Sequence, residues 1–220
     1  MPQAYQAELD SINDDLVRIT RWVGSAMNRA TQSLLDADLT LAEGVIDSDA
    51  RIDALASSIE ERCFDIVAQH HPAVNDLRAI IGALRIATSL ERMGDLAEHI
   101  AKQARLRYPR PSVPQELRAT FAVMGGVAEA IVSKTGTVIE TRDVSMSTDI
   151  AQHDAEMDHL HREMFTIVLS PTWRHGVEAA IDVTLLSRYY ERYADHAVSV
   201  TRRVINVVTG EPYVGVALES

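Results

Sequence analysis

The sequence predicts an all-α protein made of two tandem three-helix bundles that are related by a pseudo-twofold. Three observations support this prediction. Apolar residues recur every three or four positions along most of the 220 residues. Glycine and proline are sparse, so few positions can interrupt a helix. The second half of the chain repeats the residue pattern of the first, which indicates a duplicated unit.

Six long helices account for the periodic segments. Prolines break the pattern after His71 and Ser170 and in the middle of the chain. The helices are expected at 5–35, 39–70, 74–107, 115–141, 143–169 and 175–209. Their connections are short, so consecutive helices are expected to run antiparallel. No segment shows the sustained alternation of apolar and polar residues that is typical of a β-strand.

The segment YPRPSVP at 108–114 is a proline-rich, stiff linker between the two halves. We therefore expect the first three-helix bundle at 1–107 and the second at 115–220. An offset of 105 aligns acidic residues of the predicted second and fifth helices. After a shift of five residues in the connecting loop, an offset of 100 aligns acidic residues of the third and sixth helices.

The chain is acidic, with 21 Lys and Arg against 32 Asp and Glu and a formal net charge of −11. This charge argues against a nucleic-acid partner and suits metal cations or basic protein surfaces. A single cysteine, Cys63, excludes an intrachain disulfide and a cysteine-based zinc site. The N-terminus lacks signal-peptide features, and the apolar stretch 79–87 is too short to span a bilayer. We expect a cytoplasmic protein that is peripheral rather than integral at the membrane.

Each half carries Asp-x-x-x-Asp on its second helix and Glu-x-x-x-Asp on its third. These positions continue a line of apolar residues that is expected to pack against another helix. Residues four apart share a helix face, with Cβ atoms about 5–6 Å apart. Their like charges repel more strongly as the local dielectric constant falls, so a positive charge has to compensate. All-oxygen sites suit hard cations such as Mg²⁺, Mn²⁺, Ca²⁺ or iron. The candidate metal ligands are Asp49, Asp53, Glu91, Asp95, Asp154, Asp158, Glu191 and Asp195.

Salt bridges are the alternative explanation for these acidic pairs. The candidate arginine partners on the same helices are Arg78, Arg85, Arg92, Arg188 and Arg192. Duplication of the acidic motif in register favours metal binding over this alternative. His161 lies on the same line as Asp158 and could add a nitrogen ligand, but a solvent-facing or hydrogen-bonded helical histidine is the favoured interpretation. No nucleophile elbow, Walker loop or dinucleotide motif is present, so we expect no enzyme; a carboxylate-bridged metal hydrolase and a metal-free helical scaffold remain alternatives.

Three segments carry a resemblance to a known family: LAEGVIDSDARIDAL (41–55), PAVNDLRAIIGALRIATSLERMGDLAEHIAK (72–102) and YERYADHAVSV (190–200). They are similar to the PhoU family of bacterial phosphate-signalling regulators, and closest to its actinobacterial members. The resemblance implies two three-helix bundles and multinuclear iron or zinc clusters at the eight carboxylates; manganese or magnesium would also suit them. It further implies a homodimeric, cytoplasmic negative regulator that couples the phosphate ABC transporter to a sensor histidine kinase.

The sequence departs from the family pattern at two places near the acidic residues. The family often reads D-H-x-x-N after its LER motif, whereas this chain reads DLAEH from Asp95 and DHAVS from Asp195. The second repeat also carries Tyr193-Ala194 where Ile-Gly is usual. These differences leave the identity and the number of bound metal ions open.

Overall fold

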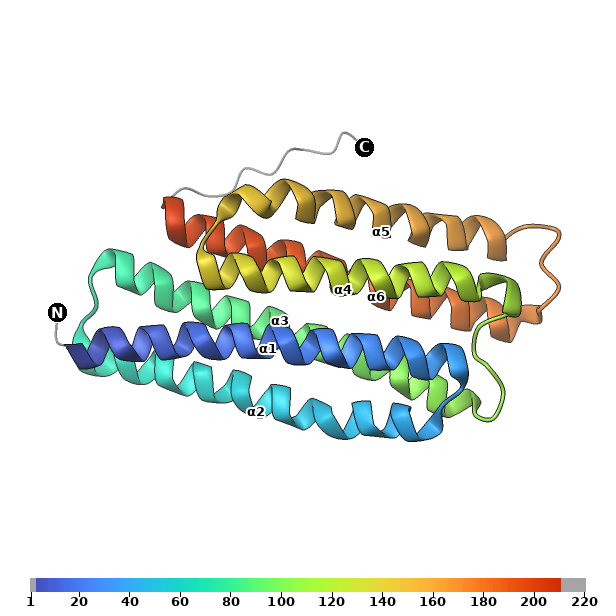
Figure 1. Cartoon of the computed structure of the whole chain (residues 1–220), viewed down its shortest axis with the longest axis horizontal. Helices are drawn as coiled ribbons and strands as arrows, with labels where there is room; N and C mark the ends of the chain where they lie inside the picture. Colours follow the sequence, from blue (N-terminus) through green and yellow to red (C-terminus); the bar gives the residue numbers. More distant parts are fainter. Residues whose placement is uncertain (1–2, 211–220) are drawn as a thin grey trace.

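The computed structural model describes residues 3–210. These residues form six α-helices and two short 3₁₀ turns, joined by loops (Figure 1). The 3₁₀ turns are η1 (Gln115–Leu117) and η2 (Val144–Met146). The helices are α1 (Gln3–Asp36), α2 (Leu39–His70), α3 (Val74–Arg107), α4 (Arg118–Thr141), α5 (Ser147–Val168) and α6 (Gly176–Thr209). No strand is present within this described part, so the all-α prediction is confirmed.

The predicted helix boundaries agree to within a few residues except at the starts of α4 and α5. There the expected starts at 115 and 143 are wrong, because a 3₁₀ turn comes before each helix. The Asp143 side chain accepts a hydrogen bond from the Ser145 backbone N–H at 2.9 Å and so tightens the chain into η2. Asp38 caps α2 by accepting from the Leu41 N–H at 2.9 Å.

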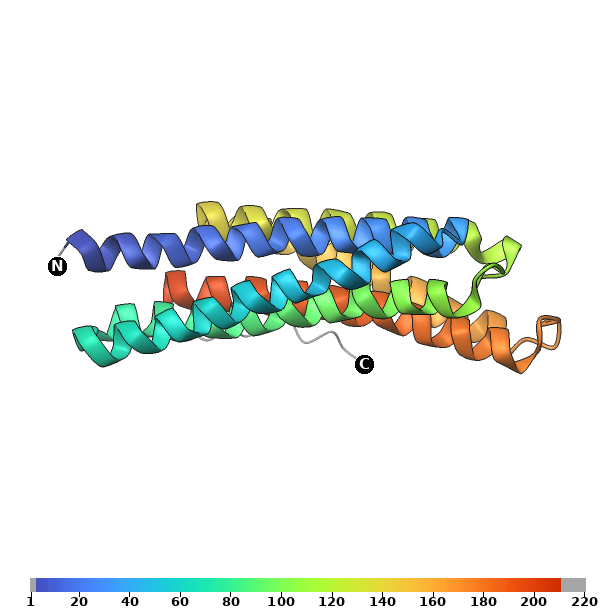
Figure 2. The same ribbon diagram turned by 90° about the horizontal axis from the view of Figure 1, so that it is seen from below.

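Helices α1 and α4 lie in one layer and α3 and α6 in the other, whereas α2 and α5 pack on the outside (Figures 1 and 2). Each central helix therefore packs against its counterpart from the other repeat, as a pseudo-twofold requires. The hydrophobic core runs without a break through both halves. Across it, the buried hydroxyl groups of Thr31 and Tyr190 are hydrogen-bonded at 2.7 Å.

The division into domains at 1–107, 108–114 and 115–220 stays a prediction, and residues 211–220 of the second unit lie outside the described part. The linker is held against the first half. Ser112 and Val113 are buried, and the Ser112 hydroxyl donates to the Gln103 carbonyl at 3.1 Å. The extensive packing of α1 on α4 and of α3 on α6 shows that the two halves share one core.

Helices α3 and α6 each carry one apolar face that is buried along its whole length. The two faces comprise Ile86, Leu90, Met93, Ala97, Ile100 and Ala104, and Leu186, Tyr190, Tyr193, Ala197, Val200 and Val204.

The prediction that the apolar residues upstream of the acidic pairs pack against another helix is wrong. Leu77, Ile81, Val177 and Ile181 are exposed by 38%, 42%, 76% and 53%. Helix α1 covers one side of the α2–α3 pair and α4 covers one side of the α5–α6 pair, and no described helix covers the other side. These residues therefore form exposed apolar surface in both halves.

Helix α4 with its leading turn, Gln115–Thr141, is long and apolar enough to cross a membrane by length and composition. Among residues 3–210 it is this segment, and not the apolar stretch 79–87, that meets the criterion. More than half of the apolar window, 56%, is buried inside the bundle, where α4 packs against α1, α5 and α6. Burial in a helical core accounts for this apolar character without a membrane.

Candidate metal centre

Three carboxylates of α2 and α3 converge near the middle of the first half. Asp49 and Asp53 lie one turn apart on α2, and Asp95 meets them from α3. One oxygen atom from each of the three lies within 4.8 Å of the other two. Oxygen ligands that share one cation at about 2.0–2.6 Å lie up to about 4–5 Å apart, so this spacing fits a single hard cation.

Asp49 is the buried member of this cluster. Its residue is 8% exposed, and its Oδ1 has no hydrogen-bond partner. Burial of an unpartnered carboxylate oxygen is costly, and a bound cation would remove the cost. Gly94 on α3 makes the site possible, because a Cβ atom at that position would lie 2.8 Å from Asp49 Oδ1. The all-carboxylate donor set suits a hard cation.

The electrostatics of the cluster show that its negative charge is incompletely neutralised. The pKa of Asp49 is raised to about 6, mainly by burial and then by the negative charges of Asp53, Glu98 and Asp95, while Lys102 opposes the shift. Burial is also the main cause of the raised pKa of Asp53, which Asp95 increases.

Burial is also the main cause of the raised pKa of Glu91, and the positive charge of Arg92 opposes this shift. Arg92 forms its ion pair with Asp95, at 2.8 Å. Arg92 and Lys102 are therefore outnumbered by the carboxylates around them.

Cation binding at this cluster is expected to weaken below pH 6. A proton and a cation compete for the Asp49 carboxylate, whose pKa is about 6, so affinity falls by up to about tenfold for each pH unit below that value. Calorimetric titration with Mn²⁺ between pH 5 and pH 8 measures this dependence. An affinity that stays constant from pH 5 to pH 7 would contradict the assignment of Asp49 as a ligand.

The four predicted ligands of the second half come near one another but do not form such a group within the described residues. The pKa of Asp154 is raised to about 6, mainly by burial and then by the negative charges of Asp158 and Asp195, while Arg202 opposes the shift. Burial raises the pKa of Glu191 as well.

Arginines pair with the other acidic groups of the second half. The ion pairs are Arg188–Glu191 at 2.5 Å, Arg192–Asp195 at 3.4 Å and Arg162–Asp158 at 4.0 Å. The salt-bridge alternative therefore describes the second half better than the first. Assignment of all eight carboxylates as metal ligands stays a prediction.

Sequence reasoning missed the roles of two residues beside the first cluster, whereas for His161 it favoured the packing role that the structure shows. Glu98 adds negative charge beside Asp49 and Asp53, and its position three residues after Asp95 was the available signal. Gly94 allows close approach, which only the fold reveals. His161 is a core residue: its Nδ1 lies 2.9 Å from the Ser187 hydroxyl, and its ring packs on Phe165.

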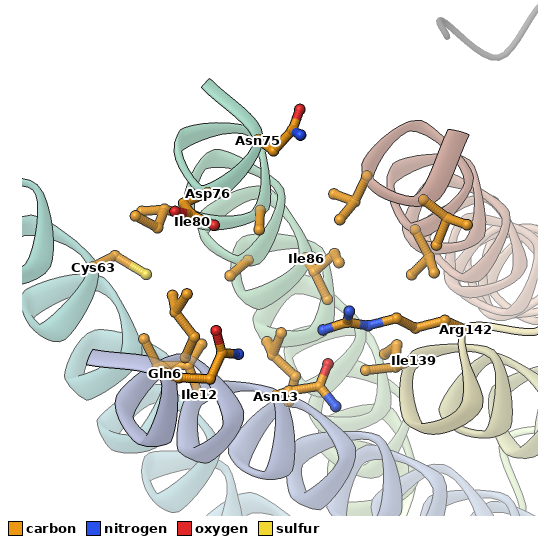
Figure 3. A pocket seen from close by; sticks show the side chains of 17 residues that line it. Gln6, Ile12, Asn13, Cys63, Asn75, Asp76, Ile80, Ile86, Ile139 and Arg142 are labelled. Atoms are coloured by element: carbon orange, nitrogen blue, oxygen red, sulfur yellow. The ribbon is translucent and has the colours of Figure 1, made fainter. Parts of the chain in front are cut away.

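A cavity of about 290 Å³ lies at one end of the bundle, between α1, α2, α3 and the ends of α4 and α6 (Figure 3). Its walls are mostly apolar, and Figure 3 shows Arg142 extending across it toward Ile86. Asp76 borders it with an Oδ2 atom that has no partner. Burial raises the pKa of Cys63, also on the wall, to about 11, so this thiol stays protonated as a core residue. Because acidic groups do not converge there, the cavity is no competing cation site.

Comparison with known proteins identifies the duplicated unit. Residues 16–104 and 121–204 each match the family model of the PhoU domain. The chain is 45% identical over 210 residues to the phosphate-specific transport system accessory protein PhoU homolog 2 of Mycobacterium tuberculosis, covering 96% of this chain and 99% of that protein. It is 43% identical to PhoU homolog 1 of Mycobacterium leprae, covering 96% and 95%.

Solved structures agree with this identification. The crystal structure of PhoU from Pseudomonas aeruginosa superposes with a TM-score of 0.82 at 27% identity, covering 94% of this chain and 100% of that chain. The phosphate transport system regulatory protein PhoU from Streptococcus pneumoniae, at 24% identity, shares the fold with a TM-score of 0.84 over 94% and 98% of the two chains. The two matched repeats and the mycobacterial relatives confirm the expected kinship: this chain belongs to the PhoU family.

Proposed function

We propose that this chain is a metal-binding negative regulator of phosphate uptake and of the phosphate-starvation response. The names of its relatives, phosphate-specific transport system accessory proteins, support the link to phosphate transport. The observation that carries the regulatory proposal is the incompletely neutralised cluster of Asp49, Asp53 and Asp95, in which Asp49 is buried. Such a cluster can change its charge when a cation binds, and the protein can thereby change how it meets a partner.

The protein would act as an adaptor between the phosphate ABC transporter and a sensor histidine kinase. Exposed apolar surface is present in both halves, and such patches commonly mark protein interaction sites. In the second half the patch comprises Phe165, Leu169, Val177, Ile181 and Leu185. A net charge of −11 favours partners with basic surfaces. We place this adaptor in the cytoplasm as a homodimer that attaches to the membrane through its partners.

The bound ion would set the charge and rigidity of the α2–α3 surface. Iron or zinc is our first assignment from the family resemblance, and manganese or magnesium also suits the oxygen ligands. Asp49 and Asp53 would hold it from α2 and Asp95 from α3, with Glu91 and Glu98 adding negative charge around it. With the ion in place, the repulsion between these carboxylates would be relieved and the two helices would be held together more firmly.

We propose that the chain is not an enzyme. A hydrolase needs an accessible nucleophile or metal-bound water next to a substrate site. The serine–histidine contact between Ser187 and His161 does not supply one, because Ser187 is fully buried and its hydroxyl also donates to the Thr184 carbonyl at 3.0 Å. No observation in the described helices favours the metal hydrolase.

A complementation experiment tests the proposal. The wild-type chain, Asp49→Asn/Asp95→Asn and the control Asp47→Asn would each be expressed in a bacterial strain that lacks its own copy. Asp47 is exposed on the same helix as Asp49, outside the cluster. We expect the wild type and the control to repress alkaline phosphatase in phosphate-replete medium. The double variant should lose both repression and bound metal while keeping a wild-type circular dichroism spectrum.

Two outcomes would contradict the proposal, each in a different part. If the wild-type chain fails to repress alkaline phosphatase, the regulatory function is wrong. If the double variant contains no metal and still represses fully, the cluster has no role in regulation.

A further inference from the structure

We propose that the two halves are unequal: the first half binds a cation tightly, whereas arginines take the place of the cation in the second half. This inference rests on the proposed metal binding and assigns it to one of the two repeats. It depends on three observations, namely the balance of charge around each acidic set, the residues that differ between the repeats, and the burial of one carboxylate.

The charges around the acidic set of the first half do not balance. Two basic side chains, Arg92 and Lys102, act on this set. Six carboxylates act on one another there: Asp49, Asp53, Glu60, Glu91, Asp95 and Glu98. The excess of negative charge in a partly buried place calls for a positive ligand.

The charges around the acidic set of the second half do balance. Its four carboxylates are Asp154, Asp158, Glu191 and Asp195, and its four arginines are Arg162, Arg188, Arg192 and Arg202. Glu191 keeps one buried oxygen without a partner, Oε2, but its other oxygen receives Arg188 Nη1 at 2.5 Å. A cation at these carboxylates would have to displace the arginines, whose positive charges would repel it.

Three positions that correspond in the two repeats explain the difference. Thr88 of α3 corresponds to Arg188 of α6, which supplies the arginine that pairs with Glu191.

Glu98 corresponds to Val198, so the second half lacks one carboxylate. Gly94 corresponds to Ala194. A methyl group at position 94 would lie too close to Asp49 Oδ1, and Ala194 carries such a methyl group in the second half. Each of the three differences disfavours a cation in the second half.

Burial distinguishes the two corresponding aspartates in the same way. Asp49 is more than nine-tenths buried, with an unpartnered oxygen in the cluster, whereas Asp154 is only half-buried. The unpartnered oxygen of Asp49 thus has little access to solvent, and a bound cation would satisfy it. The buried and unpartnered ligand, together with the three-carboxylate geometry, makes the first half the binding site.

Equilibrium dialysis against Mn²⁺ with elemental analysis tests the inference on the full chain at pH 7.5. We expect Asp49→Asn and Gly94→Ala each to lower affinity at least tenfold. Asp154→Asn should change it less than twofold. The repeat-converting variant Arg188→Thr/Ala194→Gly/Val198→Glu should gain a second tight binding event. Circular dichroism verifies that each variant is folded, and the comparison of Asp49→Asn with Asp154→Asn decides the question even if the triple variant does not fold.

The outcomes separate this inference from the proposed function. Equal loss of binding in Asp49→Asn and Asp154→Asn would overturn the inequality of the halves while leaving metal-dependent regulation intact. A wild-type chain that represses alkaline phosphatase but binds no cation would overturn the inference and retain the regulatory role. A tight site that survives Asp49→Asn and is lost in Asp154→Asn would reverse the assignment.

Discussion

Replacing Asp49 by asparagine is expected to raise the free energy of unfolding of the metal-free protein at pH 7 by about 3 kcal/mol. Burial and the neighbouring carboxylates raise the pKa of this group from 3.8 to about 6 in the folded state. A difference of one pKa unit corresponds to about 1.4 kcal/mol between the two protonation states. Asparagine keeps the shape of the side chain and removes its charge, so the repulsion from Asp53 and Asp95 disappears.

The sign of the effect determines its dependence on pH. The folded state holds the Asp49 proton more tightly than the unfolded state, so this group favours folding most at low pH. Its favourable contribution is complete below about pH 4 and is lost as the pH rises through about 6. The wild-type protein should therefore gain stability relative to Asp49→Asn as the pH falls from 7 to 5. Asp154 has a similarly raised pKa and contributes a parallel dependence to both proteins.

Urea denaturation in the presence of a chelator, at pH 5, 6 and 7, measures this difference. The control Asp47→Asn removes a charge from an exposed position of the same helix and should change stability by less than about 0.5 kcal/mol. If Asp49→Asn is less stable than the wild type at pH 7, the carboxylate makes a favourable contact in the metal-free protein. Repulsion within the cluster would then not be the dominant effect.

A residue that destabilises the empty protein is informative about function. Positions where a sequence breaks the rule against buried unpaired charge are expected at binding sites, because the ligand supplies what the fold lacks. Asp49 is such a position, while the Asp182 carboxylate shows the contrary case. Asp182 is also buried, but Arg107 binds both of its oxygens, with Nε at 2.7 Å and Nη2 at 2.9 Å. The paired carboxylate joins α3 to α6, whereas the unpaired one is available to a ligand.

The fold was predictable from the sequence because helical periodicity reports burial directly. Residues such as Leu90 and Tyr190 recur at the spacing of a helix face, and both are fully buried. The same periodicity could not show that Leu77 and Ile81 are exposed. A line of apolar residues indicates that a helix has an apolar face, but the packing of the other helices decides whether anything covers it.

The candidate site was predictable only in part for a similar reason. The sequence spacing placed Asp49 and Asp53 on one face of α2 and suggested that Asp95 would lie near them. The three carboxylates do lie together in the structure. Sequence spacing did not show that the second half would differ, because that outcome depends on how Arg188 reaches Glu191 across one turn. The role of Gly94 likewise depends on contact between two helices.

Replacing Phe121 by alanine is expected to lower the free energy of unfolding by about 3–5 kcal/mol, the usual cost of removing a fully buried aromatic side chain. Phe121 lies on α4 with no exposed surface, and its ring centre is 6.0 Å from that of Tyr190 on α6. Guanidinium denaturation followed by circular dichroism measures the loss. Val123→Ala, on the same helix at 48% exposure, is the control and should cost far less.

The same variant decides whether the two halves unfold together. The contacts of Phe121 continue through Tyr190 to Thr31 on α1, so its loss weakens packing that both halves share. Each half contains one tryptophan, Trp22 or Trp173, and the single-tryptophan variants Trp173→Phe and Trp22→Phe report on each half separately. Both probes should shift to the same lower denaturant concentration when Phe121 is replaced, because the core is continuous. If only Trp173 shifts, residues 1–107 and 115–220 unfold as independent domains. A cation bound in the first half would then stabilise that half alone, whereas in a single cooperative unit it stabilises the whole bundle, including the exposed apolar surface of α5 and α6.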